Sequence, residues 1–210
     1  MNIVTDFIQV LFTVLLVMDP IGMIPQYISV TSAFDQKTRN SIIAKAVLIA
    51  SVVLIIFLLS GKFLLDFFGI MPGTFYISGG ILFFGIALEM IYNKPRARNT
   101  PVQEQDKMAS ASVAMFPLAV PLMAGPGLLT VIIMYMSNGN NWFYSFSLLL
   151  PAIIIALAVT FIVLKGSNLV LRVIGTIGIF VVEKIMGLIL GGFSVQFIYN
   201  GLLSLGIIGK

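Results

Sequence analysis

Six apolar runs dominate the chain and restrict it to helices that cross a lipid bilayer. They cover residues 3–31, 41–60, 71–92, 112–136, 144–164 and 177–205. A transmembrane helix needs about 20 consecutive apolar residues, because the hydrocarbon core is about 30 Å thick. Only 10% of the 210 residues are charged, so the runs leave almost nothing for a soluble domain. The sequence predicts an all-α integral membrane protein with six transmembrane helices.

Basic residues between the runs predict how the helices are oriented. One set of loops holds Lys37, Arg39, Lys45, Lys94, Arg96, Arg98, Lys107, Lys165 and Arg172, whereas the other set holds only Lys62 and Lys210. Cytoplasmic loops of membrane proteins carry the excess of Lys and Arg. We therefore expect both termini outside and the polar linker 94–111 in the cytoplasm.

This linker separates two segments, 1–93 and 112–210, that resemble each other within one membrane domain. A shift of 107 positions aligns Gly80 with Gly187, Gly85 with Gly192 and Glu89 with Gln196, and a shift of 106 aligns Pro20 with Pro126. Each segment holds three apolar runs. Because three is odd, the second copy would enter the membrane from the opposite face. The alignment thus predicts two inverted three-helix repeats.

Two strings rich in proline and glycine interrupt the first and fourth runs. They read Met18-Asp19-Pro20-Ile21-Gly22 and Ala124-Gly125-Pro126-Gly127. A helix is broken at membrane depth only where the break faces protein or a polar cavity, and paired breaks indicate a transporter's binding site. Half-helices starting near Pro20 and Pro126 would direct free amides at a carboxylate, and Asp19 could hold an ammonium group. A zwitterion fits such a site.

The Asp19-Pro20 pair has a second interpretation as an ordinary helix start, with aspartate as N-cap and proline at the first helical position. An aspartate at this depth costs on the order of 3 kcal/mol, more than the ~1 kcal/mol of a cap, so function or a buried partner is the better account. Asp19, Glu89 and Gln196 are candidates for proton coupling or gating, although interface solvation explains Glu89 and Gln196 equally well. For Glu183 and Lys184, at the entry of the last run, snorkelling to the interface is expected.

The composition excludes several function classes. The chain has no cysteine and no histidine, which removes thiol chemistry and the usual zinc sites. The net charge of +4 is scattered and forms no nucleic-acid patch. We expect no enzyme activity and no cofactor, with H⁺ or Na⁺ as coupling ion, a small zwitterion and the bilayer as partners, and an oligomeric state that the sequence leaves open.

Three motifs in order resemble the MarC family of bacterial and archaeal inner-membrane proteins. They are residues 19–27 (DPIGMIPQY), 75–82 (FYISGGIL) and 117–127 (PLAVPLMAGPG). The resemblance implies a six-helix protein of the LysE superfamily, in which some members transport small neutral amino acids such as glycine and alanine. Carried over to this chain, the implied substrate-binding residues are Asp19, Pro20, Gly22, Gly125, Pro126, Gly127 and Thr130. The leading hypothesis is a secondary transporter; the alternatives are a channel for small solutes or ions and a non-transporting membrane scaffold.

Overall fold

The computed structural model describes residues 3–32, 34–92, 112, 114–138 and 142–209, and these residues form helices joined by short turns. In chain order the helices are α1 (Ile3–Met18), α2 (Met23–Thr31), α3 (Gln36–Phe68), α4 (Pro72–Tyr92), the π-helix η1 (Ala114–Met123), α6 (Pro126–Asn138), α7 (Trp142–Lys165) and α8 (Ser167–Ser204). The predicted all-α class is confirmed, and the linker predicted at 94–111 lies outside the described residues.

The helices fit a bilayer by length and composition. Four stretches of the described chain are long and apolar enough to cross it: Gln36–Gly61, Pro72–Tyr92, Trp142–Lys165 and Ile177–Ser204. Helices α1 and α2 pass the same test as a pair and are bent by 43° at the break between them. The fourth predicted run is divided into η1 and the short helix α6. The described residues therefore give four spans, or five with the bent pair.

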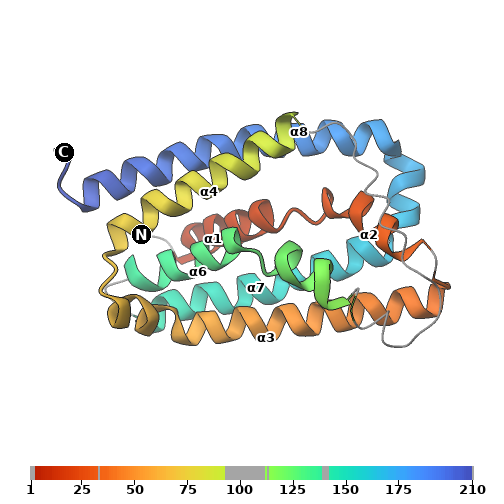
Figure 1. Ribbon diagram of the computed structural model, residues 1–210, viewed down its shortest axis with the longest axis horizontal. Helices are drawn as coiled ribbons and strands as arrows, with labels where there is room; N and C mark the ends of the chain where they lie inside the picture. Colours follow the sequence, from red (N-terminus) through yellow and green to blue (C-terminus); the bar gives the residue numbers. More distant parts are fainter. Residues whose placement is uncertain (1–2, 33, 93–111, 113, 139–141, 210) are drawn as a thin grey trace.

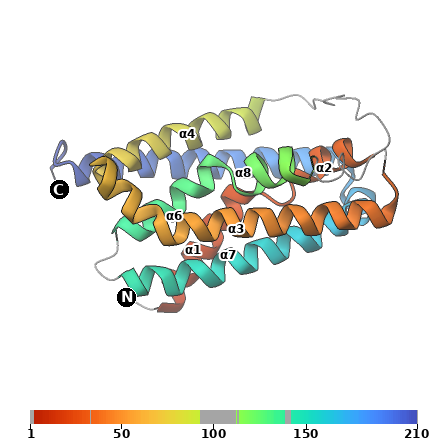
Figure 2. The ribbon, with the colours of Figure 1, turned by 60° about the horizontal axis from the view of Figure 1, so that its bottom comes forward.

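The helices form one elongated bundle in which α4 and α8 lie side by side along one edge (Figures 1 and 2). On the other side, α3 contacts η1, α6 and α7, and α1 packs against α7. The first turn of α1 and the last turn of α8 lie at the same end of the bundle (Figure 1). The break between α1 and α2 and the break between η1 and α6 both lie inside this bundle.

Glycines allow α4 and α8 to approach each other closely. A Cβ atom added to Gly80 on α4 would lie 2.7 Å from the carbonyl oxygen of Ser194 and 2.6 Å from Cγ1 of Ile198 on α8. Only a residue without a side chain fits such a contact, which is the usual role of small residues between membrane helices. Gly80 thus lets the backbones of α4 and α8 approach each other.

Gly187 on α8 makes the corresponding contact with α4. A Cβ atom added to it would lie 3.2 Å from the carbonyl oxygen of Ala87 and 3.1 Å from Cγ1 of Ile91 on α4. The positions 80, 194 and 198 become 187, 87 and 91 when the offset of 107 is added or subtracted. The two halves of the α4–α8 interface thus repeat the same contacts.

Polar groups at the helix ends fix the turns that connect the spans. Asp35 caps α3, where its carboxylate accepts a hydrogen bond of 3.2 Å from the Lys37 amide. The Arg39 guanidinium donates to the carbonyl oxygens of Thr31 at 2.8 Å and Ser32 at 2.9 Å. These carbonyls end α2 and have no partners within their own helix. Arg39 therefore ties the end of α2 to the start of α3.

Two glycines adopt backbone conformations that other residues rarely take. Gly69 ends α3 with φ 64° and ψ 27°, and the amide of Ile70 donates to the carbonyl oxygen of Leu65 at 2.9 Å, a common way to end a helix. Gly175 interrupts α8 with φ 71° and ψ 168°, a region that is essentially restricted to glycine. The membrane span of α8 begins after this interruption, at Ile177.

Candidate functional site

The first break is built around the backbone and carboxylate of Asp19. Helix α1 ends at Met18, and Asp19 has φ 43°, a left-handed conformation that aspartate tolerates better than most residues. Its carboxylate Oδ1 accepts a hydrogen bond of 3.1 Å from the Gly22 amide, and its carbonyl oxygen accepts one of 3.2 Å from the Met23 amide. Asp19 therefore closes the turn that starts α2.

Gly22 leaves room for this carboxylate. A Cβ atom added to Gly22 would lie 1.9 Å from Oδ2 of Asp19, so a larger residue would force the Asp19 side chain to move. Pro20 between them is buried and has no amide hydrogen to satisfy. Asp19, Pro20 and Gly22 thus form one turn, in which the aspartate accepts a hydrogen bond, the proline needs no partner for its nitrogen and the glycine leaves room for the carboxylate.

The expected cradle of free amides at Pro20 needs a correction. Helix α2 begins at Met23 rather than near Pro20, and the Gly22 amide at its start already binds the carboxylate of Asp19. The alternative of an ordinary helix start, with Asp19 as N-cap and Pro20 in the first helical position, is also corrected, because Gly22 is the N-cap of α2 and Asp19 binds the turn before it. A carboxylate from outside would meet an anion already in place at this helix end.

The second break differs from the first in its hydrogen bonds. The Ala124 amide donates to the carbonyl oxygen of Ala119 at 2.8 Å, a π-helical bond that closes η1. Helix α6 begins at Pro126, as predicted, since proline suits the first helical position. The hydroxyl of Thr130 donates to the carbonyl oxygen of Pro126 at 2.8 Å. The first turn of α6 directs its amides toward Gly125.

The two breaks lie against each other. A Cβ atom added to Gly127 would lie 3.2 Å from Cγ1 of Val17, two residues before Asp19, and 2.9 Å from Cε1 of Phe83 on α4. About one turn before Phe83 on α4, a Cβ atom added to Gly79 would lie 2.1 Å from Cγ2 of Thr130 on α6. The structure therefore places the last turn of α1, just before Asp19, against Gly127 of the second break, and in this conformation α4 covers Gly127 and Thr130.

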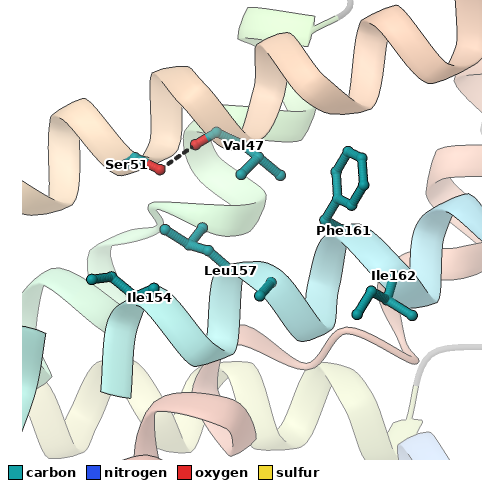
Figure 3. A pocket seen from close by; sticks show the side chains of 7 residues that line it. Val47, Ser51, Ile154, Leu157, Phe161 and Ile162 are labelled. Carbon is teal, nitrogen blue, oxygen red and sulfur yellow. Dashed lines mark hydrogen bonds between the residues drawn. The ribbon is translucent and has the colours of Figure 1, made fainter. Parts of the chain in front are cut away.

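Two apolar grooves open on the surface of the bundle near these elements. One, of about 370 Å³, runs between α3, α4 and α6 and reaches Pro126 and Thr130. The other, of about 350 Å³, lies between α3 and α7; Figure 3 shows Val47 and Ser51 facing Leu157 and Phe161 across it. The Ser51 hydroxyl donates to the carbonyl oxygen of Val47 at 2.7 Å. Both grooves have the chemistry of a surface that contacts lipid.

Glu183 on α8 lies within electrostatic range of the first break. Its half-buried carboxylate interacts with Asp19, and also with Lys184 and Glu89. The Lys184 ammonium group donates to the carbonyl oxygens of Met90, at 3.0 Å, and Ile91. Lys184 therefore binds carbonyl groups at the end of α4, and its snorkelling to the interface stays a prediction. The sequence analysis named Glu183 only as a residue at the membrane interface, and a carboxylate in an apolar run gave no sign of its interaction with Asp19.

The predicted counterpart of Glu89 is placed elsewhere. Gln196 is exposed on α8 and its amide group donates to Oδ1 of Asn200 at 2.9 Å, so it is engaged along its own helix. Within the ranges that the structure describes, no group of three or more Asp, Glu, Cys or His residues could hold a metal ion. Asp19 and Glu89 thus each interact with the same carboxylate, that of Glu183, whereas Gln196 is engaged along its own helix.

The fold and the broken first span define a multi-pass helical membrane protein. The chain matches the MarC family, described as MarC family integral membrane protein, over residues 4–205. A membrane protein of Methanocaldococcus jannaschii is 34% identical over 196 residues, covering 93% of this chain and 95% of its own length. The inner membrane protein YhgN of Escherichia coli is 32% identical over 197 residues, covering 94% and 96%. No solved structure matches the chain. The chain belongs to the MarC family.

Proposed function

We propose that this chain is a secondary transporter of small neutral amino acids of the glycine and alanine class. The observation that carries the proposal is the meeting of the two breaks, where Val17 packs on Gly127 directly beside the break at Asp19. Paired breaks that meet inside a bundle supply both ends of a zwitterion with partners. Asp19 would bind the ammonium group, and the amides in the first turn of α6 would bind the carboxylate.

The proposed architecture is six spans in two inverted three-helix repeats, with η1 and α6 together forming the fourth span. The repeated contacts of Gly80 and Gly187 support it, because an axis in the membrane plane exchanges α4 with α8 and reproduces both sets of contacts. The excess of basic residues around 94–111 supports a cytoplasmic linker and outward termini.

The tight packing at the second break supports a small substrate. There is no room for a methyl group at Gly127 while Phe83 and Val17 hold their positions. The helices must therefore separate before any substrate enters, which is what alternating access requires. A space opened between two backbone segments admits glycine or alanine more readily than a large side chain.

An ion gradient, or the gradient of the substrate itself, would supply the energy. Asp19, Glu183 and Glu89 are the acidic groups placed to exchange a proton near the break, and Na⁺ held by carbonyls of the breaks is the rival coupling ion. Neither enzyme activity nor a cofactor forms part of the proposal.

Counterflow in proteoliposomes tests the function. Vesicles loaded with unlabelled glycine should accumulate labelled glycine from outside, because a carrier exchanges substrate across the membrane. Asp19→Asn should abolish uptake driven by a gradient, whereas Asp66→Asn, at an exposed aspartate of α3, should retain it. Flux without stimulation by internal glycine would indicate a channel. No flux from folded protein would reject the transporter and favour a scaffold.

A further inference from the structure

The α4–α8 pair is joined to the rest of the bundle through two unusual glycines. Gly69 lies between α3 and α4 with φ 64°, and Gly175 lies before the membrane span of α8 with φ 71°. The two are 106 positions apart, the same offset that aligns Pro20 with Pro126. A Cβ atom added to either would have no atom within 4 Å, so neighbouring atoms do not enclose either glycine. The pair is therefore attached at two corresponding points of unusual backbone conformation.

Helix α4 is the main contact of this pair with the helix that follows the second break. Gly79 lies over Thr130, and Phe83, one turn further along α4, lies over Gly127. Phe83 is fully buried, with 0% of its surface exposed. Its ring is the largest group that fills the space beside the break.

Aromatic rings of α8 hold Phe83 in place. The ring centroids of Phe83 and Phe197 are 5.3 Å apart, and Phe197 also meets Tyr76 of α4 at 6.1 Å and Phe193 of α8 at 6.3 Å. Such pairs favour tilted or edge-on arrangements and stabilise the contact beyond the burial of area. Phe83 is thus fixed to the α4–α8 pair rather than to the break that it covers.

We propose that Phe83 determines the size of the transported substrate. This inference rests on the proposed function. The ring closes the second break when the α4–α8 pair lies against α6, and it bounds the space beside Gly127 when the pair moves away. A substrate with a side chain larger than a methyl group meets the ring and prevents closure. Phe83 is therefore a specificity residue that does not bind the charged groups of the substrate.

The test compares the exchange of labelled glycine and labelled leucine in proteoliposomes. Phe83→Ala should raise the leucine-to-glycine ratio of exchange rates by about tenfold or more, since a hydrophobic pocket discriminates about 10–200-fold per methylene group. Phe83→Leu should raise it less, because a branched side chain still fills part of the space. Phe84→Ala is the matched control, since the neighbouring ring is 45% exposed whereas Phe83 is fully buried; it should retain the wild-type ratio.

The outcomes separate this inference from the function on which it rests. If the wild type exchanges glycine and folded Phe83→Ala keeps the wild-type ratio, Phe83 does not set the size limit, although the transporter assignment stands. If the wild type exchanges no glycine, the proposed function fails and the inference with it. Size-exclusion profiles establish which variants are folded, and the more conservative Phe83→Leu decides the question if Phe83→Ala aggregates.

Discussion

Gly80 should be far more sensitive to alanine than Gly85, although both lie on α4. A Cβ atom at Gly80 would meet the backbone oxygen of Ser194 at 2.7 Å, whereas at Gly85 it would meet no atom within 4 Å. The oxygen belongs to the backbone of α8 and cannot rotate away as a side chain could. Gly80→Ala therefore forces α4 and α8 apart, and Gly85→Ala changes nothing in the packing.

The size of the expected loss of stability follows from helix propensity and from packing. Alanine in place of glycine within a helix favours folding by about 1 kcal/mol through helix propensity, and this gain is common to both variants. Overpacking a close contact costs about 1–3 kcal/mol, and the backbone contact of Gly80 places it near the upper end. The difference in free energy of unfolding between Gly80→Ala and Gly85→Ala is thus the packing term alone, about 3 kcal/mol.

The α8 side of the interface supplies an internal comparison. At Gly187 the contacts with α4 are longer, with 2.9 Å to Cβ of Met90 and 3.2 Å to the carbonyl oxygen of Ala87, and Gly192 has no atom within 4 Å. The free energy of unfolding of Gly187→Ala should therefore lie between the values for Gly80→Ala and Gly192→Ala. Denaturant titration of the purified protein in detergent gives the order. Equal stability of Gly80→Ala and Gly85→Ala would refute the close α4–α8 contact.

Three further predictions concern the second break, a helix cap and the kink of α8. Gly79→Cys combined with Thr130→Cys should form a disulfide, because the two Cβ atoms would lie 3.4 Å apart, close to the usual 3.5–4.5 Å. Oxidation should stop glycine exchange and a reductant should restore it; unchanged exchange in the cross-linked protein would show that α4 and α6 need not separate. The Thr38 hydroxyl, assisted by backbone amides, lowers the pKa of the Asp35 carboxyl. A carboxyl whose pKa is lowered on folding stabilises the fold above its unfolded pKa of about 3.9. This stabilisation is lost as the pH falls through the pKa of the folded state. Asp35→Asn should therefore flatten the loss of thermal stability below about pH 4, and an unchanged pH profile would contradict it. Gly175→Ala should lower stability by about 1–3 kcal/mol through backbone strain alone, measured by the same denaturant titration, and a neutral effect would argue against its conformation.

Much of the membrane-spanning structure could be predicted from the sequence, because hydrocarbon leaves few choices. The apolar run 71–92 became α4 at Pro72–Tyr92, and the interruption at Asp19 became a bend of 43°. The run 41–60 was predicted too short, since α3 extends from Gln36 to Phe68. Its additional turns are stabilised by the caps at Asp35 and Gly69, which apolarity alone does not reveal.

The details of the site depend on contacts between distant parts of the chain and could not be predicted. Lys184 binds carbonyl groups more than ninety positions away, at Met90 and Ile91, and no local pattern encodes such a pair. Phe83 is one of 17 phenylalanines, and only its position over Gly127 distinguishes it. The glycines were more informative about packing, since the alignment of Gly80 with Gly187 pointed to two positions that make equivalent contacts between α4 and α8.

The hydrogen bond at the first break would make cation binding at Asp19 and the order of α2 mutually dependent. One oxygen of Asp19 accepts from the Gly22 amide, and the other lies close to Gly22. A cation that drew this carboxylate away would compete with the turn that starts α2, and its binding energy would be reduced by about the 1 kcal/mol that such a hydrogen bond contributes. By reciprocity, a change that loosens α2 should strengthen cation binding at Asp19 by the same amount. The far end of α2, where Arg39 holds its last carbonyl groups, thereby becomes a place from which affinity at the break can be tuned.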